Sequence, residues 1–197
     1  MDESVKQALL KWPNVPHCFG WLGLDARGRW RMRDEQAQAG QLAGDIIAHV
    51  ALQAFINRNY GEDQAGCWYF QNGPQRVYVD LAACPFIAHT DGQQRLVLHT
   101  GEPLDQIDAV WISESGKLLF QSGTYIAQLD DRDLAQCLPW LRNGDAMVSD
   151  EELMDWLDAQ SKQPLSLIYA GKNLPVQTIA DSEIAQRFGF ICTPRPT

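Results

Sequence analysis

The sequence lacks any apolar run that approaches the ~18 residues of a membrane-spanning helix. Its first residues, Met1–Lys6, include the acidic pair Asp2-Glu3 and lead only to the short apolar group Ala8-Leu9-Leu10, which does not match a typical signal peptide. We therefore expect a soluble, cytoplasmic protein with no membrane partner. Hydrophobic residues make up 45% and charged residues 21% of the 197-residue chain, a globular composition that excludes wholesale disorder.

Positive charge is also scarce. The chain has 16 lysines and arginines against 25 aspartates and glutamates, a net charge of -9. Sequence-independent binding to nucleic acid requires a cationic surface that neutralises phosphates. The composition therefore predicts no nucleic-acid partner.

Paired cysteines are missing. The chain has 5 cysteines, an odd number, and no C-x-x-C pair occurs among them. This spacing does not match a disulfide framework or a zinc site, and we expect reduced, structural thiols. The five are Cys18, Cys67, Cys84, Cys137 and Cys192.

Recognisable catalytic motifs are absent as well. The sequence has no Gly-x-Ser-x-Gly elbow, no Gly-rich phosphate loop and no His-Glu-x-x-His motif. We predict that the protein binds no metal and no cofactor, and the missing motifs favour a protein that is not an enzyme. An enzyme whose site is assembled from dispersed residues is the alternative, for example around His89 and His99, with Cys84 near them.

An acidic cluster precedes one predicted helix. Asp130, Asp131 and Asp133 would satisfy backbone N–H groups at the start of a short helix over Leu134–Leu138. A magnesium site is the other interpretation, but capping explains the same residues more simply.

Hairpin patterning dominates what is present. Four stretches read as strand, tight turn and strand, with aromatic and β-branched residues on both sides of turn residues. Such hairpins must bury one face, which predicts an antiparallel meander with helices packed on it. The stretches are Gly20–Arg33, Cys67–Leu81, Phe86–His99 and Val110–Gln121, and a further strand is expected over Thr124–Leu129.

Within the second hairpin, Pro74 follows the Asn72-Gly73 pair and removes one N–H group, so we read Asn72–Gln75 as a four-residue loop. Helical periodicity predicts an opening helix over Ser4–Lys11 and a longer helix over Asp45–Tyr60, with Asp45 as its cap. Ser149 and Glu152 form a capping box before another helix.

The C-terminal part reads as a ββαβ unit. Strands are expected over Leu165–Ala170, Leu174–Ile179 and Phe190–Cys192, with a helix over Asp181–Phe188. The predicted fold class is α+β, with a mainly antiparallel hairpin sheet and a few packed helices. The predicted division is a domain over 1–142 and a smaller lobe over 149–197, which could also belong to the same domain.

An arginine stripe is the strongest binding signal. Arg27, Arg29, Arg31 and Arg33 are spaced by two, so one face of a strand would carry all four guanidinium groups. They would bind a phosphate or carboxylate bidentately. The plainer interpretation is a solvent-exposed polar strand face whose charges are offset by Asp34, Glu35 or other surface carboxylates.

Tryptophan is abundant, with 7 in the chain. Most are expected in the core, where each buries on the order of 200 Å². An exposed subset would line a ligand groove or a homodimer interface. Those in or beside predicted strands are Trp12, Trp21, Trp30, Trp68 and Trp111.

Several segments carry a family resemblance. They are Gly28-x-Trp30, the helical run Phe55–Tyr60, Gly66-x-Trp68 continuing to Val79, and Pro85-Phe86. The chain resembles an uncharacterised proteobacterial family of unknown function over most of its first 140 residues. This resemblance implies a soluble bacterial protein with a hairpin-rich fold, and it supplies no catalytic residues.

The sequence thus favours a non-enzymatic ligand-binding or regulatory module of a bacterial cytoplasm. The arginine stripe would contact an anionic small molecule or an acidic protein partner. Two alternatives stay open, namely an enzyme with a dispersed site and a structural or interaction protein that forms a homodimer.

Overall fold

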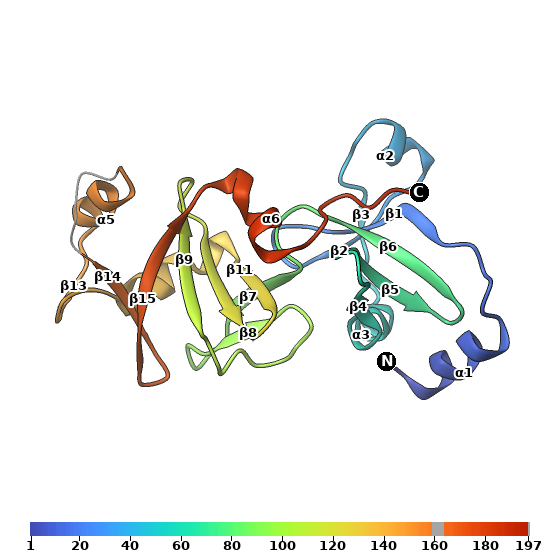
Figure 1. The fold of residues 1–197 in the computed structure, drawn as a ribbon, viewed down its shortest axis with the longest axis horizontal. Coiled ribbons are helices and arrows are strands. Elements are labelled where there is room, and N and C mark those ends of the chain that lie inside the picture. The colour runs from blue at the N-terminus through green and yellow to red at the C-terminus, as the bar shows by residue number, and fades with distance from the viewer. Residues whose placement is uncertain (159–163, 197) are drawn as a thin grey trace. The chain divides into compact units, whose positions relative to one another are not determined.

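The computed structural model describes residues 1–158 and 164–196. Contacts between residues divide the chain into two compact units (Figure 1). Unit 1 comprises Met1–Pro85 and the C-terminal segment that begins at Gly189, and unit 2 comprises Phe86–Phe188. The chain therefore leaves unit 1 after Pro85 and returns to it at its C-terminal end.

Unit 1 is built on a mixed sheet with helices beside it. Its elements are α1 (Glu3–Lys11), β1 (Cys18–Leu24), β2 (Trp30–Met32), α2 (Glu35–Ala39), β3 (Asp45–Ile46), α3 (Val50–Arg58), β4 (Tyr60–Glu62), β5 (Trp68–Asn72) and β6 (Gln75–Leu81). The strand order is β3-β2-β1-β6-β5-β4. Neighbours pair antiparallel, except β1 and β6, which are parallel.

Helix α3 covers one face of this sheet. Phe55 on the helix packs edge-on against Phe70 of β5, with ring centroids 5.4 Å apart. The indole N–H of Trp30 donates to the side-chain oxygen of Asn57 at 2.7 Å. Ile56 is almost fully buried. The apolar stripe of α3 therefore encloses the main core of unit 1.

Unit 2 contains the second mixed sheet. Its strands are β7 (Phe86–Thr90), β8 (Leu96–Leu98), β9 (Ala109–Ser113), β10 (Leu118–Ser122), β11 (Tyr125–Leu129), β12 (Leu141–Asn143), β13 (Ala146–Met147), β14 (Leu165–Tyr169) and β15 (Lys172–Ile179). Its helices are α4 (Leu134–Cys137), α5 (Asp150–Leu157) and α6 (Ile184–Phe188), with short 3₁₀ turns at Asp131–Asp133, Leu138–Trp140 and Asp181–Glu183.

The strand order in unit 2 is β13-β12-β14-β15-β9-β10-β11-β7-β8. Pairs β7–β11 and β9–β15 are parallel, and the other neighbouring pairs are antiparallel. Side chains of β7, β9 and β10 are completely buried, since Ile87, Val110, Leu119 and Phe120 have 0% exposure. Strands buried on both faces explain the near-continuous apolar runs in β9 and β10.

The α+β class is confirmed, and all four predicted hairpins form. The opening helix, the strand over Tyr125–Leu129 and the Ser149–Glu152 capping box are also present. The simple meander is incomplete as a description, because the parallel pairs β1–β6, β7–β11 and β9–β15 join hairpins that are distant in sequence.

The helix predicted over Asp45–Tyr60 is shorter than expected. Asp45 belongs to strand β3, and α3 begins at Val50 with His49 as its cap. The Nδ1 atom of His49 accepts a hydrogen bond from the Leu52 N–H at 3.2 Å. Pairing of Asp45 with Met32 in the sheet therefore overrides the local capping preference.

The four-residue loop predicted over Asn72–Gln75 is wrong. Asn72 pairs with Gln75, so the turn consists of Gly73 and Pro74. Gly73 has φ +56 at the first central position, which a type II′ turn requires, and proline then takes its ordinary negative φ at the second. The two residues therefore make a tight hairpin that the proline does not prevent.

The strand predicted over Phe190–Cys192 does not form, so the C-terminal portion predicted as ββαβ is ββα. This segment still makes two backbone hydrogen bonds in unit 1, from Ile191 N–H to the Gly66 carbonyl and from Leu81 N–H to the Cys192 carbonyl. The predicted boundary between 142 and 149 falls inside unit 2, where β12 pairs with both β13 and β14.

No helix within the described residues is long and apolar enough to cross a lipid bilayer.

Candidate functional site

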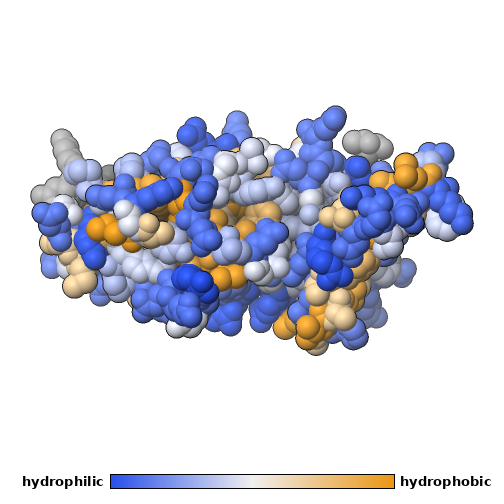
Figure 2. Space-filling model, turned by 90° about the horizontal axis from the view of Figure 1, so that it is seen from below, coloured by the Kyte–Doolittle hydropathy of each residue, from blue (hydrophilic) through white to orange (hydrophobic). Residues whose placement is uncertain are grey.

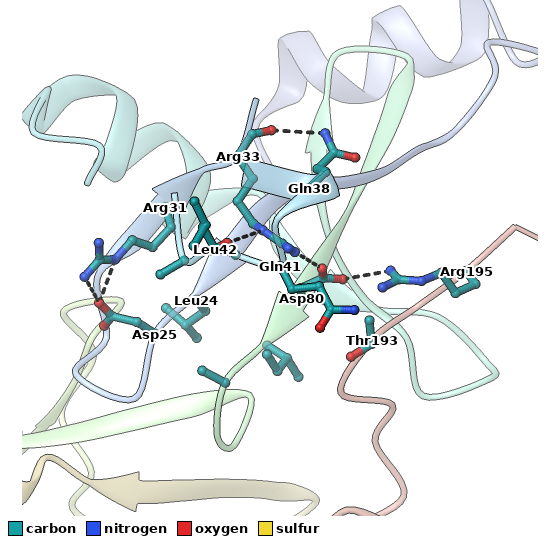
Figure 3. Close-up of a pocket in the computed structure, with 14 residues that line it drawn as sticks. Leu24, Asp25, Arg31, Arg33, Gln38, Gln41, Leu42, Asp80, Thr193 and Arg195 are labelled. Carbon is teal, nitrogen blue, oxygen red and sulfur yellow. Dashed lines mark hydrogen bonds and ion pairs between the residues drawn. The ribbon is translucent and has the colours of Figure 1, made fainter. Parts of the chain in front are cut away.

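A cavity of about 560 Å³, which we call the arginine cavity, lies in unit 1 beside β1, β2 and β6 (Figure 3). The loop after α2 and the C-terminal segment complete its walls. Charged, amide and apolar side chains all face it. The lining residues are Gly23, Leu24, Asp25, Arg31, Arg33, Gln38, Gln41, Leu42, Ala43, Asp80, Leu81, Ala82, Thr193 and Arg195.

The turn between β1 and β2 positions the first carboxylate of the cavity. One oxygen of Asp25 accepts hydrogen bonds from the backbone N–H groups of Arg27 and Arg29, both at 3.0 Å. Gly28 closes the turn with φ +71, a conformation that glycine adopts readily. This local network leaves the second oxygen of Asp25 directed at the arginine side chains.

Two guanidinium groups share that second oxygen. The Nε atoms of Arg29 and Arg31 donate to it at 2.8 Å and 2.9 Å. Burial raises the pKa of the Asp25 carboxyl, but hydrogen bonds from Arg29, Arg31 and Arg27 outweigh it, so the pKa lies below its ordinary value. Asp25 is therefore ionised at neutral pH and compensated by two cations.

A second carboxylate, Asp80 of β6, is also shared by two guanidinium groups. Nη1 of Arg33 donates to one oxygen of Asp80, and Nη1 of Arg195 donates to the other at 3.3 Å. Figure 3 shows Asp80 between these two side chains. The Arg33 and Asp80 side chains are 15% and 14% exposed, whereas Arg195 is 59% exposed. Arg195 thus forms the outer, accessible side of the cluster.

The arginines also hold the loop that follows α2. Nη1 of Arg31 donates to the Gly44 carbonyl and Nε of Arg33 to the Leu42 carbonyl, both at 3.0 Å. Gly44 has φ +79, and a Cβ atom there would lie 2.2 Å from the Met32 carbonyl oxygen. Glycine is therefore required at the point where this loop crosses β2.

The structure brings together only part of the predicted arginine stripe. Strand β2 covers Trp30–Met32 alone, so Arg27 lies in the preceding turn and Arg33 follows the strand. Arg31 and Arg33 line the cavity, whereas Arg27 and Arg29 are outside its lining. The offsetting carboxylates are Asp25 and Asp80. Of the carboxylates named from the sequence, Asp34 instead caps α2.

Arg195 and Asp80 were not predicted as site residues. Arg195 is 115 positions from Asp80 in the chain, so no local spacing connects them. The return of the C-terminal segment to unit 1 creates the contact. The only sequence signal was the isolated arginine between Pro194 and Pro196.

The two candidate histidines occupy different surroundings in unit 2. Nδ1 of His89 lies 3.3 Å from the carboxylate of Asp130. Nδ1 of His99 accepts the Ile87 N–H at 3.2 Å. Burial, and to a lesser extent nearby His89, lowers the pKa of His99 to about 3. His99 is therefore a neutral imidazole at pH 7 and is not the imidazolium that acts as a general acid.

Within the acidic cluster, Asp130 caps the 3₁₀ turn over Asp131–Asp133, whereas the Asp133 side chain does not cap α4. Asp130 accepts from the backbone and guanidinium of Arg132, and Asp133 accepts from the Thr90 N–H at 2.7 Å. Burial opposes ionisation of Asp130, but the bonds from Arg132 lower its pKa well below the usual range. Within the described residues, no group of three or more histidine, cysteine, aspartate or glutamate side chains is placed to hold a metal ion.

An apolar cavity of about 260 Å³ lies between α3 and the sheet of unit 1. Trp21 and Met32 line it, with 39% and 46% exposure. Of the strand-associated tryptophans, Trp30, Trp68 and Trp111 are buried as predicted, whereas Trp12 and Trp21 are exposed. Figure 2 shows hydrophobic atoms in several separate patches, at the left and centre of the face in view as well as at its right.

Comparison with solved structures shows the same fold in a DUF1285 family protein from Silicibacter pomeroyi DSS-3. The TM-score is 0.51 at 12% sequence identity, and the match covers 87% of each chain. At this identity the similarity concerns the fold alone. None of the curated proteins matches the sequence.

The family model DUF2944, which carries the description 'Protein of unknown function (DUF2946)', matches residues 1–195. This match spans both units and includes all residues that line the arginine cavity. The uncharacterised family indicated by the sequence is thereby confirmed, with no activity assigned to it. The chain belongs to the DUF2944 family of proteins of unknown function.

Proposed function

We propose that the protein is a non-enzymatic module that binds a small anionic ligand in the arginine cavity of unit 1. One observation carries this proposal: Arg33 and Arg195 converge on Asp80 from opposite sides at the wall of an open cavity. Two guanidinium groups face one carboxylate, so their combined charge is only half compensated. An anion that enters the cavity meets the remaining positive charge.

The cavity also has the size and chemistry of a small-molecule site. Its volume of about 560 Å³ lies within the ~300–1,000 Å³ typical of ligand pockets. Apolar walls from Leu24, Leu81 and Ala82 adjoin the arginines. Such a concave, mixed surface suits a small molecule better than the broad surface of an acidic protein partner.

Thermal unfolding in the presence of small anions tests the proposal. We expect a carboxylate or phosphate ligand at about 100 times its Kd to raise Tm by roughly 5–10 °C. Arg195→Ala should abolish the shift. Arg95→Ala is the matched control, because Arg95 is 62% exposed and also pairs with an aspartate, but it lies in unit 2. Equal shifts in both variants would contradict the proposed site.

A homodimer is the second candidate, and exposed apolar side chains favour it. Trp21, Met32 and Ile46 are 39%, 46% and 46% exposed on unit 1. Burial of such a patch against its copy follows two-fold symmetry in most homodimers. Light scattering after size-exclusion chromatography should then give twice the chain mass, and Trp21→Glu should restore the monomer. A monomer at all concentrations would reject this candidate.

We also propose a cytoplasmic location. The cysteines Cys18, Cys67, Cys84, Cys137 and Cys192 are all free thiols, which suits a reducing compartment. Fractionation of cells that express the full chain tests this location. Recovery of the protein in an oxidising compartment, with its cysteines no longer free, would contradict it.

A further inference from the structure

The hydrogen bonds of Arg31, Arg33 and Arg195 show which of their nitrogen atoms remain available to a ligand in the arginine cavity. All three nitrogens of Arg31 already have partners, namely Asp25 and the Gly44 carbonyl. Arg33 uses Nε for the Leu42 carbonyl and Nη1 for Asp80. Arg195 uses Nη1 for Asp80 and the Pro194 carbonyl. Among the residues that the structure describes, none bonds to Nη2 of Arg33 or to Nε and Nη2 of Arg195, and these nitrogens remain for a ligand.

These nitrogens belong to two guanidinium groups on either side of Asp80 and carry five N–H donors. A carboxylate presents two acceptor oxygens and a phosphate monoester three, so the number of donors admits either anion. Selection between the two anions must therefore come from charge.

Arg33, Asp80 and Arg195 form a trio of charged side chains, and its net charge constrains the charge of the ligand. Arg33 and Arg195 contribute two positive charges and Asp80 one negative charge, so the trio carries a net charge of +1. A monoanion neutralises it. A phosphate monoester carries nearly two negative charges at pH 7 and leaves one uncompensated charge beside the largely buried Asp80 carboxylate.

Apolar wall residues indicate what accompanies the anionic group. Leu24 and Leu81 are almost fully buried at the cavity, and Leu42 is 61% exposed at its rim. Contact with a ligand would remove apolar surface of Leu42 from water, which favours a ligand with a hydrophobic body.

We infer that the arginine cavity selects monocarboxylates with a hydrophobic body over phosphate esters, and that Asp80 is the residue that determines this selectivity. This inference rests on the proposed anion-binding function. Asp80 fills the position between Arg33 and Arg195 that a second ligand charge would otherwise occupy. It thereby limits the site to one negative charge.

Benzoate and phenyl phosphate test the inference, since they share a phenyl ring and differ in the anionic group. Isothermal titration of the full chain at pH 7.5 should show a lower Kd for benzoate. Asp80→Asn raises the net charge of the trio to +2, so it should shift the Kd ratio toward phenyl phosphate by about fivefold or more, the effect of a unit charge at ~4 Å in water. Arg95→Ala should leave both Kd values unchanged.

A second measurement does not require the variant to fold. Phenyl phosphate loses one charge as the pH falls through ~6, its second pKa. In the wild-type protein its Kd should therefore decrease relative to that of benzoate between pH 7.5 and pH 5. Tighter binding of phenyl phosphate at pH 7.5 would overturn the selectivity but leave an anion site in place. No binding of either probe would overturn both this inference and the proposed function.

Discussion

Single residues set the electrostatics of both units, and His99 shows how. Its pKa of about 3 arises from burial and from the nearby His89. An unfolded histidine titrates near 6.5, so the unfolded chain binds more protons between about pH 6.5 and pH 3. The stabilising contribution of neutral His99 is complete above pH 6.5. It is lost by about 1.4 kcal/mol per unit as the pH falls through that window.

His99→Asn should remove this pH dependence while an amide oxygen accepts the Ile87 N–H in place of Nδ1. Between pH 7 and pH 5, we expect the free energy of unfolding of the wild type to fall by about 2 kcal/mol more than that of the variant. Urea unfolding followed by tryptophan fluorescence at the two pH values measures the difference. Parallel losses in the two proteins would show that His99 is not the responsible group.

At this scale the sequence located the arginines but not their partners. The spacing of Arg31 and Arg33 was informative because both residues belong to or adjoin one strand. Asp80 and Arg195 became neighbours through tertiary contacts, which a period of two residues does not encode. The plainer interpretation, a solvent-exposed strand face, does not describe Arg31 and Arg33, whose side chains are 18% and 15% exposed.

At the scale of elements, the caps make measurable contributions. Ser149 begins α5, and its side chain accepts the Glu152 N–H at 3.2 Å while Glu152 accepts the Ser149 N–H at 2.8 Å. Ser149→Ala should lower stability by about 1 kcal/mol, because the Glu152 N–H loses the acceptor that the Ser149 hydroxyl provides. Ser149→Asp should retain most of it. Amide hydrogen exchange across α5 would report the change, and equal exchange in both variants would argue against the cap.

The contact of the C-terminal segment depends on one glycine. A Cβ atom on Gly66 would lie 2.1 Å from the Gly189 carbonyl oxygen, and Gly66 has φ +79. Gly66→Ala should therefore cost on the order of 1–3 kcal/mol and displace the segment. Because Thr193 and Arg195 line the cavity, anion binding should weaken as well.

Gly61→Ala provides the control, since a Cβ atom there would meet nothing within 4 Å. Urea unfolding and ligand titration of the two variants give the comparison. Indistinguishable stability of Gly66→Ala and Gly61→Ala would contradict the close contact.

Local elements were predictable where the signal was local. The hairpins followed from turn residues between apolar runs, and the Ser149–Glu152 box fixed the start of α5. The start of α3 was misplaced because pairing of Asp45 with β2 is a long-range interaction. The parallel pairs β1–β6, β7–β11 and β9–β15 are equally non-local, which is why a meander was expected.

At the scale of the whole chain, the division into units 1 and 2 and the boundary predicted from the sequence lead to opposite expectations for the folding of isolated fragments. Unit 2 is a continuous segment, Phe86–Phe188, that contains every strand of its sheet. A fragment over 86–188 should unfold cooperatively in urea. A fragment over 1–142 ends within β12 and lacks β13, β14 and β15, so β9 loses one neighbour and β12 loses both, and that part of the sheet should not form. Circular dichroism of both fragments decides between the two divisions.

The return of the chain to unit 1 has a consequence for biosynthesis. Translation delivers all of unit 2 before Cys192 and Arg195, the residues that bond to Leu81 and Asp80. Since domains generally fold as they emerge from the ribosome, unit 2 can reach its native state first. The arginine cavity, whose outer side is Arg195, is then completed only after unit 2 has been made, so the nascent polypeptide cannot form this cavity while unit 2 is still being synthesised.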